Sequence, residues 1–471
     1  MEVDTDRTLE SGVVRDFLRD LVQVDRPGTP LPPFDTVVEE IHQLGVEPGT
    51  PVMVAMPNGA PFVTVVCALL VRGAVPVLLP PSAPPSRIER MARALGADAL
   101  IAPRVPPGPH AGVPPRTLGG FARFARLSGV DTLRYRPGEI ILLTSGTSGV
   151  FSGCLHRVDS LLRNAGRHAR AIGQSVADSV LISLPMHYSY AFVAQLLATF
   201  VTGGRAVIAG PPFTPAHYHR TIQEHGVTVS SLTPTMVESW LGAGERLPAP
   251  LRRLTVGGDA CAASSVADVL KHNAGLELYL TYGLTEAGPR VSTLAAHLEP
   301  PFRHGSVGLP LPGVQVRLRT ADADDRVGEL IVETDTGMLR RVGRRDEPEP
   351  PVSGSTTSIS TGDLFERDDD GYLYFRGRRP SYVISRGEKV SLKSVCALAE
   401  TIPGVQGAEA WTHENTAGDV VFTLDVYCAD PSIDEQEIRR RLATVLLRSE
   451  QPARLLIHPA TDLGWRKSAG K

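Results

Sequence analysis

From residue 52 to residue 102 the chain alternates between short apolar runs and longer segments with helical periodicity. A glycine directly follows each helical segment, at Gly73 and Gly96, as is common at helix ends. Buried strands connected by helices are typical of a parallel sheet, so the sequence predicts an α/β fold. The expected strands are 52–56, 75–79 and 99–102, and the expected helices are 61–72 and 86–95.

Similar alternation continues between residues 140 and 280, but the pattern changes after Gly305. Short alternating strands are expected there, for example at 314–318 and 329–332, followed by a flexible loop at 346–357 that is rich in Pro, Glu, Ser and Thr. The last 90 or so residues suggest a small α+β domain. We therefore predict a large domain over residues 1–379, which includes a β-rich subdomain, and a small domain over residues 380–471.

The composition excludes several classes of protein. With 48 Lys and Arg against 51 Asp and Glu, no basic excess is available to neutralise nucleic-acid phosphates, so no nucleic-acid partner is expected. The longest apolar runs, 65–71 and 191–201, are shorter than the roughly 20 residues of a membrane span. No signal peptide is evident at the acidic start, and we expect a cytoplasmic location. Five scattered cysteines without Cys-x-x-Cys spacing argue against a disulfide framework or a structural zinc site.

A loop of small hydroxyl and glycine residues follows the apolar run 140–143. Glycines allow close approach of the backbone, and backbone N–H groups and hydroxyls donate to phosphate oxygens. The loop predicts a polyphosphate site, although a solvent-exposed loop after a core strand gives the same pattern. Its residues are Thr144, Ser145, Gly146, Thr147, Ser148 and Gly149.

Three other segments carry residues suited to a nucleotide. Residues 282–286, Tyr-Gly-Leu-Thr-Glu, offer an aromatic face, a glycine, a hydroxyl and a carboxylate for Mg²⁺. In residues 254–260 an apolar run opens into two glycines and an aspartate, suited to packing against a flat ring. Further along, Asp363 can accept hydrogen bonds from two ribose hydroxyls, and Arg378 adds a cation.

These segments, in this order, resemble the adenylate-forming superfamily: acyl- and aryl-CoA synthetases, firefly luciferase and the adenylation domains of peptide synthetases. The resemblance extends from Val52 nearly to the end of the chain and includes Gly305-Ser306-Val307-Gly308. It implies a large N-terminal domain of α/β layers with a β-rich subdomain, and a small, mobile C-terminal α+β domain that acts as a lid.

The resemblance also implies a role for each residue. The loop 144–149 would bind the ATP phosphates, Tyr282 would stack on adenine, Thr285 would contact the α-phosphate, and Glu286 would hold Mg²⁺. Alternatives are a core aromatic role for Tyr282 and a helix cap for Asp363. The remaining implied nucleotide-binding residues are Gly258, Asp259, Gly283, Asp363 and Arg378.

The acid-binding residues implied by the resemblance include His187, in a segment that lines the acyl pocket of family members. His187 is a candidate wall or gate, with a purely structural histidine as the alternative. An amino-acid substrate is disfavoured, because residues 187–190 contain no acid to pair with an α-ammonium group. The other implied acid-binding residues are Tyr188, Gly257 and Thr281.

The implied reaction is ATP-dependent activation of a small carboxylic acid, either aryl or short acyl. The carboxylate attacks the α-phosphate of ATP, giving acyl-AMP and pyrophosphate, and catalysis rests on positioning and charge neutralisation. The acyl group then passes to a thiol, of CoA or of a carrier protein's phosphopantetheine, or to an amine. Alternatives are a catalytically degenerate nucleotide- or acyl-binding partner protein, and an adenylating enzyme with an unusual second half-reaction.

Three positions depart from the family pattern. Ser152 replaces the lysine that usually follows the phosphate loop, a loss expected to lower the rate about 10²–10³-fold. Pro380, with its fixed φ, occupies the hinge about which the small domain turns. We assign the catalytic C-terminal lysine to Lys471, with Lys467 and Arg466 as alternative cations and a frayed tail as the structural alternative.

Overall fold

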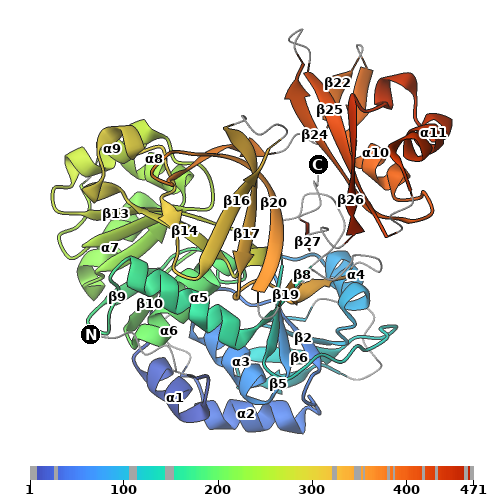
Figure 1. Ribbon diagram of the computed structural model, residues 1–471. Coiled ribbons are helices and arrows are strands. Elements are labelled where there is room, and N and C mark those ends of the chain that lie inside the picture. Colours follow the sequence, from blue (N-terminus) through green and yellow to red (C-terminus); the bar gives the residue numbers. More distant parts are fainter. Residues whose placement is uncertain are drawn as a thin grey trace. The chain divides into compact units, whose positions relative to one another are not determined.

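A computed structural model describes residues 8–25, 30–105, 114–143, 153–244, 246–320, 326–343, 352–353, 356–378, 382–385, 388–415, 420–429, 433–460 and 465–466. The chain divides into two compact units, which we call unit 1 (1–314 and 334–347) and unit 2 (315–333 and 348–471) (Figure 1). Unit 2 continues on both sides of Pro380, which itself lies outside the described residues. The predicted domain boundary there stays a prediction.

Unit 1 contains an eight-stranded sheet that is parallel from β1 to β13 and ends in two antiparallel strands. The parallel part has the buried apolar strands expected between residues 140 and 280. In spatial order the strands are β1 (Val22–Gln23), β10 (Arg205–Ile208), β9 (Ser179–Ile182), β11 (Val229–Leu232), β12 (Arg253–Gly257), β13 (Glu277–Gly283), β14 (Arg290–Ala295) and β15 (Leu309–Pro310).

A second eight-stranded sheet of unit 1 holds the strands predicted nearest the start of the chain. Strands β4, β2, β3 and β7 run parallel, whereas the outer strands pair antiparallel. In spatial order they are β18 (Arg340–Val342), β8 (Gly153–Arg157), β7 (Glu139–Leu143), β3 (Val75–Leu78), β2 (Pro51–Val54), β4 (Ala99–Ala102), β6 (Ala122–Arg126) and β5 (Arg116–Leu118). The predicted α/β fold is confirmed.

The helices of unit 1 fill the space between its sheets and cover their outer faces. The main apolar core joins residues of both sheets with α3, α5 and η1, so these helices lie between the sheets. Helix α3 has eight buried residues among its twelve, as expected of a helix enclosed on all sides. The helices are α1 (Ser11–Arg19), α2 (Phe34–Gln43), α3 (Ala60–Val71), α4 (Pro85–Leu95), α5 (Val158–Ala171), the π-helix η1 (Tyr190–Leu197), α6 (Ala198–Thr202), α7 (Pro215–His225), α8 (Pro234–Gly242) and α9 (Ala263–His272).

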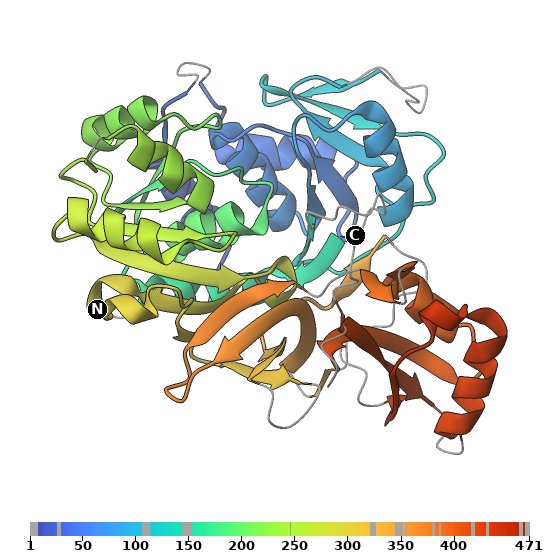
Figure 2. The ribbon, with the colours of Figure 1, turned by 90° about the horizontal axis from the view of Figure 1, so that it is seen from above.

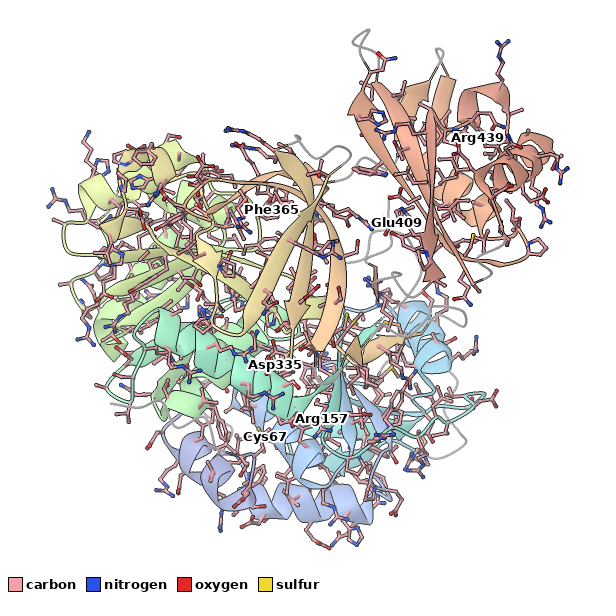
Figure 3. All side chains as sticks on the ribbon, viewed as in Figure 1. Cys67, Arg157, Asp335, Phe365, Glu409 and Arg439 are labelled. Atoms are coloured by element: carbon pink, nitrogen blue, oxygen red, sulfur yellow. The ribbon has the colours of Figure 1, made fainter. Side chains whose placement is uncertain are left out.

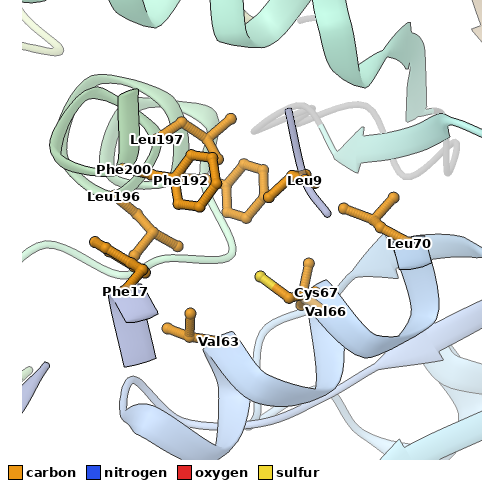
Figure 4. A pocket seen from close by; sticks show the side chains of 10 residues that line it. All are labelled: Leu9, Phe17, Val63, Val66, Cys67, Leu70, Phe192, Leu196, Leu197 and Phe200. Atoms are coloured by element: carbon orange, nitrogen blue, oxygen red, sulfur yellow. The ribbon is translucent and has the colours of Figure 1, made fainter. Parts of the chain in front are cut away.

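A small pocket between α1, α3 and η1 has a lining of apolar side chains, including Phe17, Phe192 and Cys67 (Figure 4). Burial raises the pKa of the Cys67 thiol to about 12, so this group stays protonated at neutral pH. The pocket therefore lacks the charged groups that a nucleotide or a carboxylate requires. Within the described ranges, no helix combines the length and the apolar character needed to cross a membrane.

Unit 2 contains the β-rich part of the chain and an α+β part. The α+β part is a three-stranded sheet, β24 (Val405–Glu414), β25 (Val420–Cys428) and β26 (Arg454–Pro459), with α10 (Leu392–Ala399) and α11 (Glu435–Val445) on one face (Figures 1 and 2). Beside it, β22 (Tyr382–Ser385) pairs with β23 (Glu388–Ser391). The β-rich sheet contains β16 (Val314–Arg319), β17 (Val327–Thr334), β19 (Val352–Ser353), β20 (Thr356–Arg367), β21 (Leu373–Arg378) and β27 (Trp465–Arg466).

The prediction of a flexible loop over 346–357 is wrong where the structure describes this segment. Strand β19 pairs antiparallel with the start of β20, with Val352 opposite Thr357 and Ser353 opposite Thr356. Thr is favoured in strands, and the long β20 provides the backbone partners that a local reading of Pro and Ser content cannot detect.

Arg319 connects the two larger sheets of unit 2. Its guanidinium forms ion pairs with Glu329 on β17 and with Glu409 on β24, and it donates to the Tyr427 hydroxyl at 3.0 Å. Glu409 is labelled in Figure 3. Burial acts to lower the pKa of Arg319, but the charges of Glu409 and Glu329 outweigh burial and raise this pKa. A partly buried guanidinium shared by two carboxylates therefore fixes the β-rich and α+β parts of unit 2 to each other.

Candidate functional site

The carboxyl ends of β12 and β13 bring most of the predicted site residues of unit 1 together. Gly257 ends β12 directly opposite Thr281 of β13, and Tyr282 and Gly283 complete β13. A short 3-10 helix, η2 (Thr285–Ala287), follows. A Cβ atom at Gly283 would lie 2.2 Å from the carbonyl oxygen of Pro289, so only glycine allows this close passage of two backbone segments.

Glu286 forms a buried ion pair with Arg341. The Arg341 guanidinium donates to Oε1 of Glu286 at 2.6 Å, and the two side chains are 5% and 1% exposed. Arg341 lies on β18 of the second sheet, so this pair connects the two sheets of unit 1. Sequence reasoning missed Arg341, because the two residues are 55 positions apart and no local pattern relates them.

His156, on β8, is a second residue near Glu286 that sequence reasoning missed. Its side chain is fully buried, and burial lowers its pKa to about 4, although the charge of Glu286 and the backbone of Thr285 oppose this shift. The imidazole is therefore neutral at physiological pH. His156 therefore adds no positive charge beside the carboxylate, which pairs with Arg341.

The residues around Glu286 fit a Mg²⁺ ion that is held mainly by a nucleotide. Within the described ranges, no group of three or more His, Cys, Asp or Glu side chains could form a metal site. Mg²⁺ usually keeps several waters and takes one or two carboxylates together with substrate phosphates. A carboxylate has acceptor positions on both oxygens, so the bond from Arg341 to Oε1 is compatible with metal ligation by Glu286.

Thr285 lies against the segment that precedes η1. Its hydroxyl and that of Ser189 are 2.8 Å apart. Asn58 fixes this segment, because its amide group donates to the carbonyl of Leu184 and accepts from the N–H of Met186, both at 2.8 Å. These contacts set the position of the Thr285 hydroxyl.

The predicted acid-binding residues Gly257 and Thr281 lie around the guanidinium of Arg290. The Thr281 hydroxyl accepts from Arg290 at 2.8 Å and donates to the carbonyl of Val256 at 3.1 Å. The guanidinium carbon of Arg290 lies 3.8 Å from the ring centroid of Tyr190. Sequence reasoning singled out neither Arg290 nor Tyr190, although an arginine four residues after the Tyr-Gly-Leu-Thr-Glu segment is a signal that the sequence contains.

Gly257, the last residue of β12, is tightly packed, whereas the next residue, Gly258, leaves space beside Tyr190. A Cβ at Gly257 would lie 2.3 Å from the Thr281 hydroxyl, and a Cβ at Gly258 would lie 3.7 Å from Cδ1 of Tyr190. Gly258 also has a φ of 92°, which favours glycine. Asp259 is exposed, and its carboxylate accepts from the N–H of Ala260 at 2.8 Å within the same turn.

His187 is buried, whereas its neighbour Tyr188 is 43% exposed. Their ring centroids are 4.3 Å apart, and burial lowers the pKa of His187 to about 4. The His187 ring is therefore neutral at physiological pH. Its role as a wall or gate of the acid pocket stays a prediction.

The two residues predicted to bind ribose are brought together in unit 2. Asp363 on β20 lies directly opposite Arg378 on β21, and Nε of Arg378 is 3.1 Å from Oδ1 of Asp363. Asp363 is buried, but the Arg378 side chain is 68% exposed. The position of Asp363 in the middle of a strand rules out the helix cap considered above.

Several predicted residues lie outside the described residues. These are the phosphate loop 144–149 with Ser152, the proline at the expected hinge, and the C-terminal Lys467 and Lys471. For Arg466 the structure describes the backbone, which pairs with Ser360 of β20.

The sequence matches the family described as AMP-binding enzyme, in agreement with the geometry around Tyr282–Glu286. This match covers residues 40–127 and 137–340, more than half of the chain and all of the site residues described in unit 1 up to Arg290. The chain belongs to the AMP-binding enzyme family. The predicted resemblance to the adenylate-forming superfamily and the prediction of an AMP-forming acid ligase are confirmed at the level of this family.

Proteins with similar sequences are named as CoA ligases. A 2-succinylbenzoate–CoA ligase of Bacillus licheniformis is 28% identical over 329 residues, which cover 67% of this chain and 66% of that protein. A sulfoacetate–CoA ligase of Cupriavidus necator is 27% identical over 282 residues, covering 58% of this chain and 53% of that protein. The chain thus matches about half to two thirds of the length of these relatives.

Solved structures of the superfamily share the fold along almost the whole chain. The o-succinylbenzoate CoA synthetase of Bacillus subtilis, in complex with an acyl-adenylate intermediate, has a TM-score of 0.64 at 19% identity and covers 97% of this chain and 96% of its own. The amide bond synthetase of Marinactinospora thermotolerans has a TM-score of 0.62 at 20% identity and covers 95% of both chains. These likenesses establish a common fold.

Proposed function

We propose that the protein activates a small carboxylic acid with ATP and Mg²⁺ and then transfers the acyl group to a thiol, that of CoA in the first instance. The observation that carries this proposal is the convergence of Gly257, Thr281 and Tyr282–Glu286 at the carboxyl ends of two parallel strands, in a chain of the AMP-binding enzyme family. The o-succinylbenzoate CoA synthetase has been solved with ATP and magnesium ion and with an acyl-adenylate, which supports the same cofactors here.

In the first step, a carboxylate oxygen of the acid attacks the α-phosphorus of ATP. The bond from this phosphorus to the bridging oxygen breaks, and pyrophosphate leaves with the electron pair. In the second step, the thiolate attacks the acyl carbon and AMP leaves. Mg²⁺, when bound, supplies charge neutralisation for the phosphates.

The chain's own residues position the reactants in this proposal. Tyr282 offers its ring to adenine, and the Thr285 hydroxyl, fixed by Ser189, contacts the α-phosphate. Glu286, held by Arg341, is the metal ligand. Asp363 and Arg378 of unit 2 bind the ribose hydroxyls. Loop 144–149 binds the phosphates, and Gly258, Asp259 and Gly283 also bind the nucleotide. His187 and Tyr188 belong to the acid pocket.

The C-terminal cation and the hinge belong to the same proposal. Lys471 approaches the reacting carboxylate and α-phosphate during adenylation, and the small domain from about Pro380 onwards acts as the lid. With Ser152 in place of a lysine, we expect slow adenylation. A carrier protein's phosphopantetheine and an amine are the other acceptors, and the amide bond synthetase shares the fold. The cytoplasmic location stays a prediction.

Acid-dependent exchange of labelled pyrophosphate into ATP tests the first step. We expect exchange with some members of a panel of aryl and short acyl acids, and loss of about 10²–10³-fold in Glu286→Gln, because this change removes a preorganised charge from the phosphate site. The matched control is Glu435→Gln, at an exposed position of α11, which should exchange at the wild-type rate.

Absence of exchange with every acid, while ATP still binds, would favour the degenerate binding protein. Lys471→Ala tests the C-terminal assignment: an unchanged adenylation rate would transfer this role to Lys467 or Arg466. Addition of CoA, a phosphopantetheinylated carrier or an amine to the acyl-adenylate then identifies the acceptor, and a rate of thioester formation comparable with adenylation would contradict an impaired hinge at Pro380.

A further inference from the structure

The guanidinium of Arg290 is buried without a carboxylate partner among the described residues. Arg290 is 2% exposed, and one of its nitrogens donates to the Thr281 hydroxyl at 2.8 Å. Nε and the other terminal nitrogen have no hydrogen-bond partner within the described ranges. A buried charge without a partner is strongly unfavourable, so proteins rarely retain one unless something binds to it.

The contrast with Arg341 shows how unusual this is. Arg290 and Arg341 are the two arginines classed as buried within the described residues. Arg341 donates to the carboxylate of Glu286, whereas the described side chains in contact with the Arg290 guanidinium are those of Thr281 and Tyr190. Neither group carries a full negative charge.

His168, a titratable group near Arg290, cannot supply this charge either. His168 on α5 is fully buried, and burial together with the charge of Arg290 lowers its pKa well below the usual value. The stacking of Arg290 on Tyr190 provides a weaker cation–π attraction. The described residues that contact Arg290 therefore supply no counter-charge.

The guanidinium is held rigidly at the edge of the proposed acid site. The backbone of Arg290 exchanges two hydrogen bonds with the side chain of Asn164, at 2.9 and 3.0 Å. Arg290 begins β14 opposite Gly283, and a Cβ at Gly257 would lie 3.4 Å from its nearest terminal nitrogen. Gly257 packs directly against Thr281 and leaves no room for a further atom. At the exposed Gly258, a Cβ would keep ordinary van der Waals distance from Tyr190, so ligand atoms can approach the stacked Tyr190 and Arg290 on that side.

We propose that Arg290 binds a second anionic group of the acid substrate. The substrate class is then a carboxylic acid that carries a further carboxylate or sulfonate, and the guanidinium binds this group while the other carboxylate reacts. The inference rests on the proposed function, since it assigns the substrate of the same site. A planar guanidinium donates two parallel hydrogen bonds to such a group, which gives selectivity over neutral analogues.

The observations favour the acid over the nucleotide as the source of this anion. Arg290 contacts Thr281 and Tyr190 and lies beside Gly257, on the acid side of the site. Thr285 and Glu286, the residues proposed for the phosphates and Mg²⁺, instead contact Ser189 and Arg341. If Arg290 served the nucleotide, its loss would affect all acids equally.

Paired acids that differ only in the second charge test the proposal. The probes are succinate with monomethyl succinate, isophthalate with monomethyl isophthalate, and 3-sulfobenzoate with 3-(methylsulfonyl)benzoate. The measurements are kcat/KM in pyrophosphate exchange and the shift in melting temperature caused by each acid. We expect the dianionic member of at least one pair to react about 10²–10³-fold faster than its neutral analogue, because the analogue leaves the guanidinium unpaired.

Variants locate this preference at Arg290. In Arg290→Met the preference should fall to less than about tenfold, and the stabilisation of the protein by the dianion should disappear, whereas Arg290→Lys should keep part of both because it keeps the charge. The exposed Arg205→Leu is the matched control and should behave as the wild type. If Arg290→Met does not fold, the rates of the paired acids with the wild-type protein still test the preference for a second negative charge.

The outcomes separate the two proposals. Equal rates within every pair, an equal loss for both members in Arg290→Met, or a raised KM for ATP alone would overturn the role of Arg290 while leaving the enzyme in place. If no acid supports exchange, the proposed function fails, and the melting temperatures then test the anion site at Arg290. Stabilisation by dianions alone, abolished in Arg290→Met, supports this site. Absence of such stabilisation overturns the site.

Discussion

The buried pair of Glu286 and Arg341 gives a quantitative prediction. Arg341→Met removes the guanidinium that donates to Glu286 at 2.6 Å and leaves a carboxylate that is 1% exposed. At about 4 Å between charge centres and an effective dielectric constant near 20, the lost attraction is about 4 kcal/mol. Broken buried pairs typically cost about 3–5 kcal/mol, because the remaining charge is uncompensated. We expect a loss of this size in the free energy of unfolding of unit 1.

The assay needs a signal from unit 1 alone. Trp240 is buried in α8 of unit 1, whereas the other two tryptophans, Trp411 and Trp465, belong to unit 2. Replacing both of the latter by Phe leaves Trp240 as the fluorescence reporter of unfolding in urea, and all variants are made in this background. At about 2–4 °C per kcal/mol, the melting temperature of unit 1 should fall by roughly 6–20 °C.

A double-mutant cycle separates the pair from other effects. Glu286→Gln in the Arg341→Met background should recover most of the stability, because it removes the buried carboxylate that lost this guanidinium. Arg15→Met is the matched control, since Arg15 pairs with Asp35 at the surface of unit 1, and it should lose less than about 1 kcal/mol. If the losses in free energy of unfolding caused by Arg341→Met and by Glu286→Gln add to within about 0.5 kcal/mol in the double mutant, the prediction is wrong.

Two further predictions concern pH and unit 2. Burial lowers the pKa of His156 and of His187 to about 4. As the pH falls below about 6.5, these histidines bind protons in the unfolded chain before they do so in the folded protein. The free energy of unfolding should therefore fall between pH 6.5 and 4, by up to roughly 3 kcal/mol for His156. Urea titrations at a series of pH values check this, and His156→Gln should flatten the profile; an unchanged profile would contradict it. Arg319→Met leaves Glu329 and Glu409 facing each other and should destabilise unit 2 by about 3–5 kcal/mol. Hydrogen exchange of the backbone amides of β24 measures this loss. Little change in their protection would show that the ion pairs are not coupled.

Local patterns in the sequence predict the elements of unit 1 closely. The expected strand at 99–102 coincides with β4, and the expected helix at 86–95 differs from α4 by one residue. Gly96 ends this helix with a φ of 62°, as a residue without a Cβ does readily. These features depend on neighbours in the chain, so the sequence alone is enough to predict them.

The contiguous part of the site follows from the sequence for the same reason. Tyr282–Glu286 is a single segment, so its aromatic, hydroxyl and carboxylate groups arrive together at the end of β13. Asp363 and Arg378 were also recognised in the sequence, but their contact depends on the pairing of β20 with β21. A hairpin brings such residues together over a short distance in the chain.

Only the tertiary structure determines which charges face one another in the interior. Glu286 meets Arg341 because β18 joins the second sheet beside β8, and Ser189 meets Thr285 because Asn58 fixes the preceding segment. Sheet order and long-range packing set these distances, and no local periodicity records them. For the same reason, the sequence contains Arg290 but cannot reveal that it is buried without a carboxylate, since burial and the absence of a partner are properties of the assembled core.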